Sequence, residues 1–371
     1  MSYRVNASRM ELRLNSQINV AKCIIEANCR RAELAAYLCR LGRFDEARVA
    51  LDSLREQARR QPHAELSTWI HLAEGLFTYF SNVGASKGDG IQRAYALGSA
   101  AGLGELRATC AAWLAQLDYA RVDMPTLAVH VREALQLASP ANHSARSRAN
   151  LVAAEALHLA GRPDLALAWY RRARDHAMAE HDDVTVSALM HNMAWTRMLL
   201  MRQAILSGQD DESAGRHALM NSESTANFDQ LLGDSSWQEL KPILRAQILS
   251  LQGDASQALV LYEAHLDELK SVSRFQANLF ADKAWCYTQC GQLKAGCECA
   301  EQAVLSLGNT TDADDLAAAH GRLAQTFSAL GDLDRGDKHR DMAAEAWATH
   351  EATQASALSL LSSLNENGQA C

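Results

Sequence analysis

Two tryptophans stand at the same distance from a side chain that could pair with a polypeptide backbone. Asn192 precedes Trp195 by three residues, and Asp282 precedes Trp285 by three residues. A carboxamide donates and accepts hydrogen bonds at once, which suits it to the backbone of an extended peptide. Tryptophan adds a large apolar surface and one N–H, a combination common among interface anchors. These pairs favour a peptide- or protein-binding face; the alternative is that both rings pack between neighbouring helices.

Nine cysteines raise the question of a metal or redox site, and four of them are clustered: Cys286, Cys290, Cys297 and Cys299. A structural zinc site usually presents two thiolates from a Cys-x2-Cys knuckle. Here the first pair is one helical turn apart, and the second pair is separated by one residue, which directs the two thiols apart. Packing of free thiols is therefore favoured over a metal or redox role, which stays open.

No motif for catalysis or nucleotide binding occurs in the sequence. It lacks His-Glu-x2-His, Gly-x-Ser-x-Gly and the glycine fingerprint of dinucleotide-binding folds. His176 and His181, beside Asp182 and Asp183, form the densest histidine group, but they are five residues apart. Two ligands for one metal are normally four apart on a helix. We therefore expect a chain that is not an enzyme and that needs no metal or cofactor.

The composition limits which kinds of partner and which cellular compartment we expect for this chain. The 371 residues include 36 basic and 44 acidic side chains, a net charge of −8, which argues against a general nucleic-acid binder. No run approaches the roughly 18 apolar residues that cross a bilayer, and the first residues lack the apolar core of a secretion signal. We expect a cytoplasmic protein with no nucleic-acid or membrane partner.

The helix breaks recur along the chain. Five segments begin with Gly, continue with turn or N-cap residues, and carry Ala or Gly five positions on: 42–47, 161–166, 253–258, 291–296 and 331–336. The last three of these glycines are separated by 38 and 40 residues. Gly ends the first helix because it tolerates a left-handed backbone, and the small residue lets the second helix approach its neighbour closely. The repeat predicts a solenoid of helical hairpins.

One frame of residues recurs in the helices before the turns, at spacings of three, one and three. It comprises Trp69, Leu72, Ala73 and Leu76; Phe280, Lys283, Ala284 and Tyr287; and His320, Leu323, Ala324 and Phe327. With Ala166, Tyr170 and Ala173 of a second helix, this frame resembles the tetratricopeptide repeat family, in the longer-repeat variety of bacterial signalling regulators. The resemblance implies an all-α, right-handed superhelical solenoid of antiparallel helical hairpins, whose first helices line a concave groove.

The frame divides the chain into four parts. We expect an N-terminal helix in residues 1–27, a solenoid of about eight hairpins over 28–348, a capping helix at 349–364 and a disordered tail at 365–371. The expected hairpins are 28–62, 66–102, 105–140, 147–181, 185–233, 236–270, 274–308 and 314–348.

The groove implied by the resemblance selects the candidate partner-binding residues. They are His191, Asn192, Trp195, Asp282, Trp285, Gln289, Arg322 and Gln325, with Arg148, Glu155 and His158 at matching positions in the fourth hairpin. The expected function is a non-catalytic scaffold or adaptor that binds another protein or a peptide. The alternative is a bacterial ligand- or peptide-responsive regulator that signals to a separate output partner. Binding by the outer face and homodimer formation also stay open.

Overall fold

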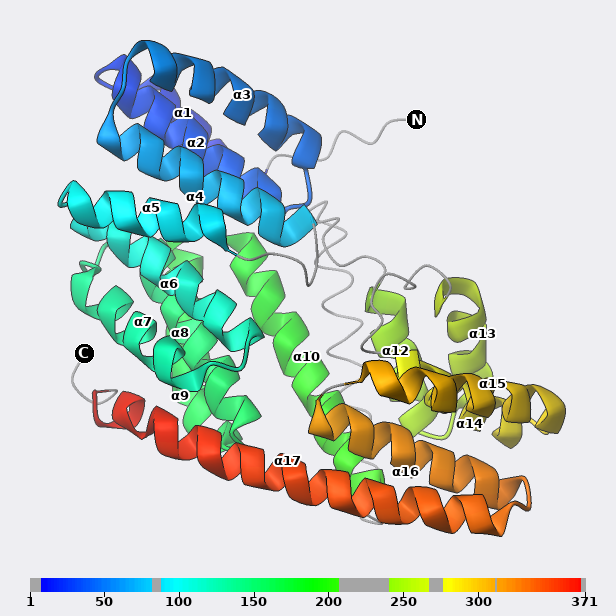
Figure 1. Cartoon of the computed structure of the whole chain (residues 1–371). Helices are drawn as coiled ribbons and strands as arrows, with labels where there is room; N and C mark the ends of the chain where they lie inside the picture. The colour runs from blue at the N-terminus through cyan, green and yellow to red at the C-terminus, as the bar shows by residue number, and fades with distance from the viewer. Residues whose placement is uncertain (1–7, 82–87, 207–239, 267–275, 311, 368–371) are drawn as a thin grey trace. The chain divides into compact units, whose positions relative to one another are not determined.

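The computed structural model describes residues 8–81, 88–206, 240–266, 276–310 and 312–367. In these ranges it contains sixteen α-helices, one short 3-10 helix and no β-strand, and the α-helices pack neighbour to neighbour (Figure 1). The prediction of an all-α chain is confirmed. None of the helices in these ranges combines the length and the apolarity that crossing a membrane requires.

The helices belong to two compact units. The first unit holds described residues 8–81, 88–189 and 355–367; the second holds 190–206, 240–266, 276–310 and 312–354. Two helices have residues in both units, α10 (Asp183–Leu206) and α17 (Leu333–Asn367).

The first unit is built from an alternating series of helices. Their bounds are α1 Arg9–Asn19, α2 Ile24–Arg40, α3 Phe44–Arg60, α4 Ala64–Ser81, α5 Asp89–Ala100, α6 Gly104–Ala120, α7 Met124–Leu137, α8 His143–Leu159 and α9 Pro163–Glu180. Helices α2, α4, α6 and α8 contact one another in succession, and each of them also contacts the helix that follows it in the chain. Side chains at matching positions of these even-numbered helices are therefore brought near one another.

The second unit repeats the same scheme. It contains α12 Leu240–Leu251, α13 Ala255–His265, α14 Gln276–Gln289, α15 Leu293–Ser306, the 3-10 helix Leu307–Asn309 and α16 Ala313–Ala329, with parts of α10 and α17. Helix α14 contacts both α12 and α16, while α13 and α15 each pack against the helix before them. The C-terminal half of α10 packs against α12 in an apolar cluster that includes Met198, Met201 and Ile248.

The recurring glycines have the backbone that the sequence predicts. All five turn glycines have positive φ, from 72° at Gly161 to 88° at Gly331. The small residue five positions on is also needed where it is Gly, because a Cβ at Gly296 would lie 2.6 Å from Thr288 Oγ1. The predictions for the turns and for the close helix approach are confirmed at these positions.

Two turns have the same backbone without a glycine, at Val122 and at His181. Between α6 and α7, Val122 has φ 59°, and the N–H of Asp123 donates to the carbonyl of Asp118 at 2.9 Å. The Gly161 turn makes the equivalent bond, from the N–H of Arg162 to the carbonyl of Leu157, also at 2.9 Å. A β-branched residue in the left-handed region is rare and costs about 1–2 kcal/mol. Val122 is therefore a strained position in the first unit.

The ends of the chain differ from the expected boundaries. The first 27 residues contain α1 and the beginning of α2, which starts at Ile24. Residues 349–364 are not a separate capping helix but continue α17, and 365–367 are helical too. Leu361 and Leu364 lie in the hydrophobic cluster of the first unit that also contains Trp169. The second half of the fifth expected hairpin and residues 368–371 lie outside the described ranges.

Candidate functional site

The eight predicted partner-binding residues lie on three helices of the second unit. His191, Asn192 and Trp195 are on α10; Asp282, Trp285 and Gln289 are on α14; and Arg322 and Gln325 are on α16. The structure brings four of them together on α14 and α16: Asp282, Trp285, Arg322 and Gln325.

Asp282 is the centre of this group. Its Oδ2 accepts a hydrogen bond from Arg202 Nη2 at 2.6 Å, and its Oδ1 accepts one from Arg322 Nε at 2.9 Å. Tyr262 donates its hydroxyl to Oδ2 at 3.5 Å. These contacts join α10, α13, α14 and α16. We call Arg202, Tyr262, Asp282, Trp285, Arg322 and Gln325 the Asp282 cluster.

Burial makes the ion pairs of the Asp282 cluster consequential. Asp282 is 1% exposed, Arg202 2% and Arg322 3%. A charge taken this far from water is stable only when it is paired and hydrogen-bonded. Burial, and then the charge of Asp282, raise the pKa of Tyr262 well above its usual value, so its hydroxyl stays protonated and donates.

Arg322 also positions the two cluster residues that keep exposed surface. Its Nη1 donates to Gln325 Oε1 at 2.9 Å, and its guanidinium carbon lies 5.8 Å from the ring centre of Trp285. Trp285 and Gln325 are partly exposed, and Gln289, one turn beyond Trp285, is exposed. The cluster thus leaves parts of Trp285 and Gln325 at the surface of the second unit, and Arg322 contacts both from below.

Sequence reasoning missed Arg202 and Tyr262. Arg202 follows Leu199, Leu200 and Met201 in a strongly apolar stretch of α10. An arginine in such a stretch is expected to be buried, and a buried arginine needs an acidic partner. Its partner lies 80 residues further along the chain. The spacing of residues within one helix cannot reveal a contact between residues so far apart in the sequence.

The three predicted partner-binding residues on α10 have different surroundings from those of the Asp282 cluster. Trp195 is partly buried against the apolar cluster formed by Met198, Met201 and Ile248. This is the packing interpretation that the sequence left open for the tryptophans. His191 and Asn192 are half-buried, and both take part in interactions within the protein.

The matching residues of the fourth hairpin lie in a buried polar group of the first unit. Arg148 Nη1 donates to Gln116 Oε1 at 3.2 Å, and the guanidinium lies 4.1 Å from the ring centre of Trp113. Burial, and then the charge of Arg40, lower the pKa of Arg148 to about 10. Burial also raises the pKa of Glu155 to about 7. The structure thus surrounds these two residues with other protein groups.

Ion pairs join the two ends of the first unit's helix series. Arg40 on α2 contacts Asp182, in the turn between α9 and α10, at 2.8 Å, and it donates to Thr185 Oγ1 at 2.6 Å. Arg13 on α1 pairs with Glu180 at 2.6 Å. These residues are separated by more than a hundred positions in the sequence, so the pairs link α1 and α2 to the end of α9 and the start of α10.

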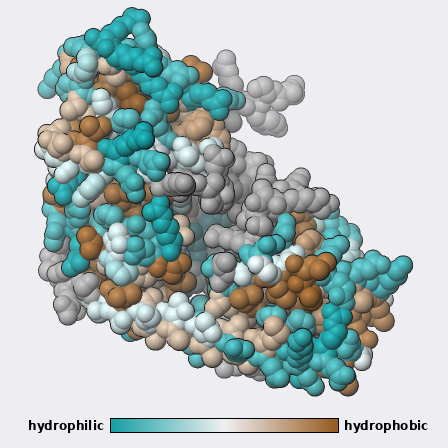
Figure 2. Space-filling model, in the orientation of Figure 1, coloured by the Kyte–Doolittle hydropathy of each residue, from teal (hydrophilic) through white to brown (hydrophobic). Residues whose placement is uncertain are grey.

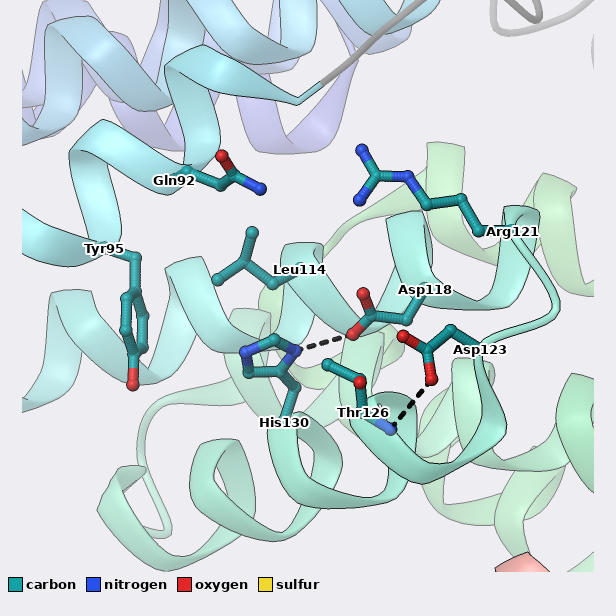
Figure 3. Close-up of a pocket in the computed structure, with 8 residues that line it drawn as sticks. All are labelled: Gln92, Tyr95, Leu114, Asp118, Arg121, Asp123, Thr126 and His130. Atoms are coloured by element: carbon teal, nitrogen blue, oxygen red, sulfur yellow. Dashed lines mark hydrogen bonds and ion pairs between the residues drawn. The ribbon is translucent and has the colours of Figure 1, made fainter.

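A cavity of about 320 Å³ lies between α5, α6 and α7 of the first unit (Figure 3). Among its lining residues, His130 Nδ1 and Asp118 Oδ2 are 2.6 Å apart, and Asp123 Oδ1 accepts the N–H of Thr126 at 3.3 Å. The lining residues are Gln92, Tyr95, Leu114, Asp118, Arg121, Asp123, Thr126 and His130. We call it the α5–α7 pocket; the sequence analysis did not identify it.

The clustered cysteines have the properties of packing residues where they are buried. Burial raises the pKa of Cys286 to about 12 and that of Cys299 to about 11, which keeps both thiols protonated at neutral pH. Cys290 and Cys297 are exposed. Across the part of the chain that the structure describes, no three His, Cys, Asp or Glu side chains are placed to hold a metal ion.

No protein-family model matches this chain, and no curated protein matches it at a significant level. We therefore infer function from the contacts of the described residues.

Proposed function

We propose that this chain is a non-catalytic, cytoplasmic interaction scaffold or adaptor that binds a peptide segment or a protein surface. Its fold would be the right-handed superhelical solenoid of antiparallel hairpins that the tetratricopeptide repeat resemblance implies. The alternating contacts support this proposal, since α12, α14 and α16 follow one another in space while α13 and α15 each pack on the preceding helix.

The observation that carries the proposal is the buried support beneath Trp285 and Gln325. An interface anchor is effective when its side chain is held in place before the partner arrives. Arg322 contacts both residues and is itself fixed by Asp282. A partly exposed tryptophan with a neighbouring carboxamide offers an apolar contact and backbone pairing to an extended peptide.

Selection from a random peptide library on the full-length chain tests this proposal. Selected peptides should lose about 10-fold or more in affinity for Trp285→Ala, because buried aromatic anchors dominate binding energy. Trp347→Ala is the matched control: it removes a partly exposed tryptophan of the same unit, on α17. Equal binding by wild type and Trp285→Ala, or an equal loss in the control, would contradict the proposed surface.

The outer face is the alternative location for a partner. On the face seen in Figure 2, apolar side chains reach the surface among polar ones. Exposed apolar residues of the second unit include Val260 on α13 and Leu293 and Leu305 on α15, with exposures from 53% to 82%. Peptides selected on the chain should keep their affinity for Val260→Ser and Leu305→Ser if Trp285 is the anchor.

A second candidate function is a bacterial ligand-responsive regulator that passes its signal to a separate output protein. The α5–α7 pocket is the observation that favours it, because a small ligand there would contact three helices at once. Small-angle scattering with and without a bound ligand would detect a change in curvature, and an unchanged profile would count against this function.

A further inference from the structure

We propose that the peptide or protein segment bound at Trp285 carries an acidic side chain, an aspartate or a glutamate, that lies against Trp285 and Gln325. An acidic residue at this position rests on the proposed function, because it belongs to the partner of the same surface. The hydrogen-bonding groups and the charges of the Asp282 cluster both favour a negatively charged acceptor there.

The two partly exposed residues of the cluster offer hydrogen-bond donors to a partner. Among the described residues, neither the indole N–H of Trp285 nor Nε2 of Gln325 has a hydrogen-bond partner. The carbonyl oxygen of Gln325 is already used, since it accepts from Arg322 Nη1 at 2.9 Å, and an indole has no acceptor. A partner therefore meets N–H groups at this surface and must supply oxygen acceptors.

The net charge directly beneath these donors is positive. Arg202 and Arg322 are buried cations that both pair with Asp282, while Tyr262 is neutral, so the four side chains together carry one positive charge. Asp282 is 1% exposed, and its two oxygens accept from the two arginines and Tyr262, so a partner does not touch it. Solvent screens charges at this depth only weakly.

Both arginines also have unused hydrogen-bonding capacity. Arg202 Nε and Arg322 Nη2 are buried and have no hydrogen-bond partner in the described structure. Unmet donors of a buried cation are unfavourable, and a nearby negative charge offsets part of that cost through its field. Because Asp282 and Gln325 already hold Arg322 in place, this field is present before a partner arrives.

The other buried carboxylate on this face of α16 lies toward the opposite end of the helix. Asp315 precedes Arg322 by seven residues, about 10 Å of helix, and its Oδ1 accepts from Asn278 Nδ2 at 2.7 Å. Asn278 in turn precedes Trp285 by seven residues on α14. The negative charge of Asp315 is therefore distant from Trp285, and the surface around Trp285 stays attractive to an anion.

Peptides displayed with their C-terminus joined to a carrier can be selected on the full-length chain, so that only side chains supply carboxylates. Selected peptides that lose affinity for Trp285→Ala should share an acidic residue. Synthesised with an amidated C-terminus, each should bind at least about 10-fold more weakly when that glutamate or aspartate is exchanged for its amide. The affinity of the parent peptide should also fall as salt is added.

Charge changes at Gln325 test the same contact from the protein side. Gln325→Glu should weaken the selected peptides at least about 10-fold, and Gln325→Lys should strengthen them by about 3-fold or more. Gln325 is partly exposed, so both variants should fold, which circular dichroism checks. Gln302→Glu is the matched control, because it makes the same change at an exposed position of α15 and should alter affinity by less than about 2-fold.

The outcomes separate this contact from the proposed function. Peptides that need Trp285 but bind equally well after their acidic residue is neutralised would overturn the acidic contact and leave the proposed surface standing. Equal effects of Gln325→Glu and Gln302→Glu would overturn it as well. Peptides whose affinity is unchanged by Trp285→Ala would overturn both the acidic contact and the proposed function.

Discussion

Arg202 on α10 and Asp282 on α14 form a buried ion pair of 2.6 Å between residues 80 positions apart. Arg322 reaches the same carboxylate from α16. This arrangement makes Asp282 the common acceptor for two cations. The charges of both buried arginines are therefore balanced by one side chain.

Asp282→Asn should destabilise the protein by about 3–5 kcal/mol, because it leaves two buried guanidiniums without a negative partner. Arg202→Met should cost less, since Asp282 keeps Arg322. Urea unfolding followed by circular dichroism measures both. The control is Arg340→Met, which removes an exposed ion pair of the second unit with Asp337 and should change stability by less than about 1 kcal/mol. A comparable loss in all three variants would refute a special role for Asp282.

Val122→Gly should stabilise the first unit by roughly 1 kcal/mol. The substitution relieves a left-handed β-branched residue, and this gain exceeds the entropy that an added glycine costs in the unfolded chain. Val129→Gly, an exposed helical position on α7, should instead destabilise by about 0.5 kcal/mol. Thermal unfolding of the two variants is the test; a loss of stability in Val122→Gly would show that the turn is not strained.

Glu155→Gln should gain stability relative to wild type as pH rises. Burial raises the pKa of Glu155 from 4.5 to about 7, so the folded state holds a proton that the unfolded state releases between these values. The wild type therefore loses stability as pH rises from 4.5 to 7, and the variant lacks this loss. The difference between the two should change by about 2–3 kcal/mol from pH 5 to pH 8. A pH-independent difference would contradict the raised pKa.

His339 should produce the opposite pH dependence in the second unit. Its Nδ1 lies 2.8 Å from that of His320, and burial, followed by the neighbouring charges, lowers its pKa from 6.5 to about 4. The unfolded state then binds the proton first, so stability is present above pH 6.5 and falls toward pH 4. The melting temperature of His339→Gln should fall less than that of the wild type when the pH is lowered from 7 to 5. A variant that is as acid-sensitive as wild type would show that another group is responsible.

The sequence was most informative where structure is local. The turn glycines were predictable because the left-handed backbone is a property of single residues, and Gly296 signals a close helix approach by its size alone. The repeat resemblance placed Asp282, Trp285, Arg322 and Gln325 at equivalent positions of successive hairpins, and the structure brings these four together.

Contacts between distant segments could not be predicted. Nothing near Arg202 indicates which of the chain's carboxylates it reaches, and the pairing of Arg40 with Asp182 depends on how helices α2 to α9 pack on one another. The expected break before residue 349 is absent because neither Gly nor Pro interrupts α17 there, so the helix continues through the end of the repeat pattern. Val122 was overlooked because its turn, like that of His181, lacks the glycine that marks the five predicted turns.

Hydrogen exchange of the full-length chain with a library-selected peptide tests the central claim, that a partner binds around Trp285, most directly. The account predicts slower exchange in α14 and α16, centred on Trp285, Gln289 and Gln325, with α13 and α15 unchanged. Protection confined to α13 and α15 would place the partner on the second helices and contradict the proposed surface.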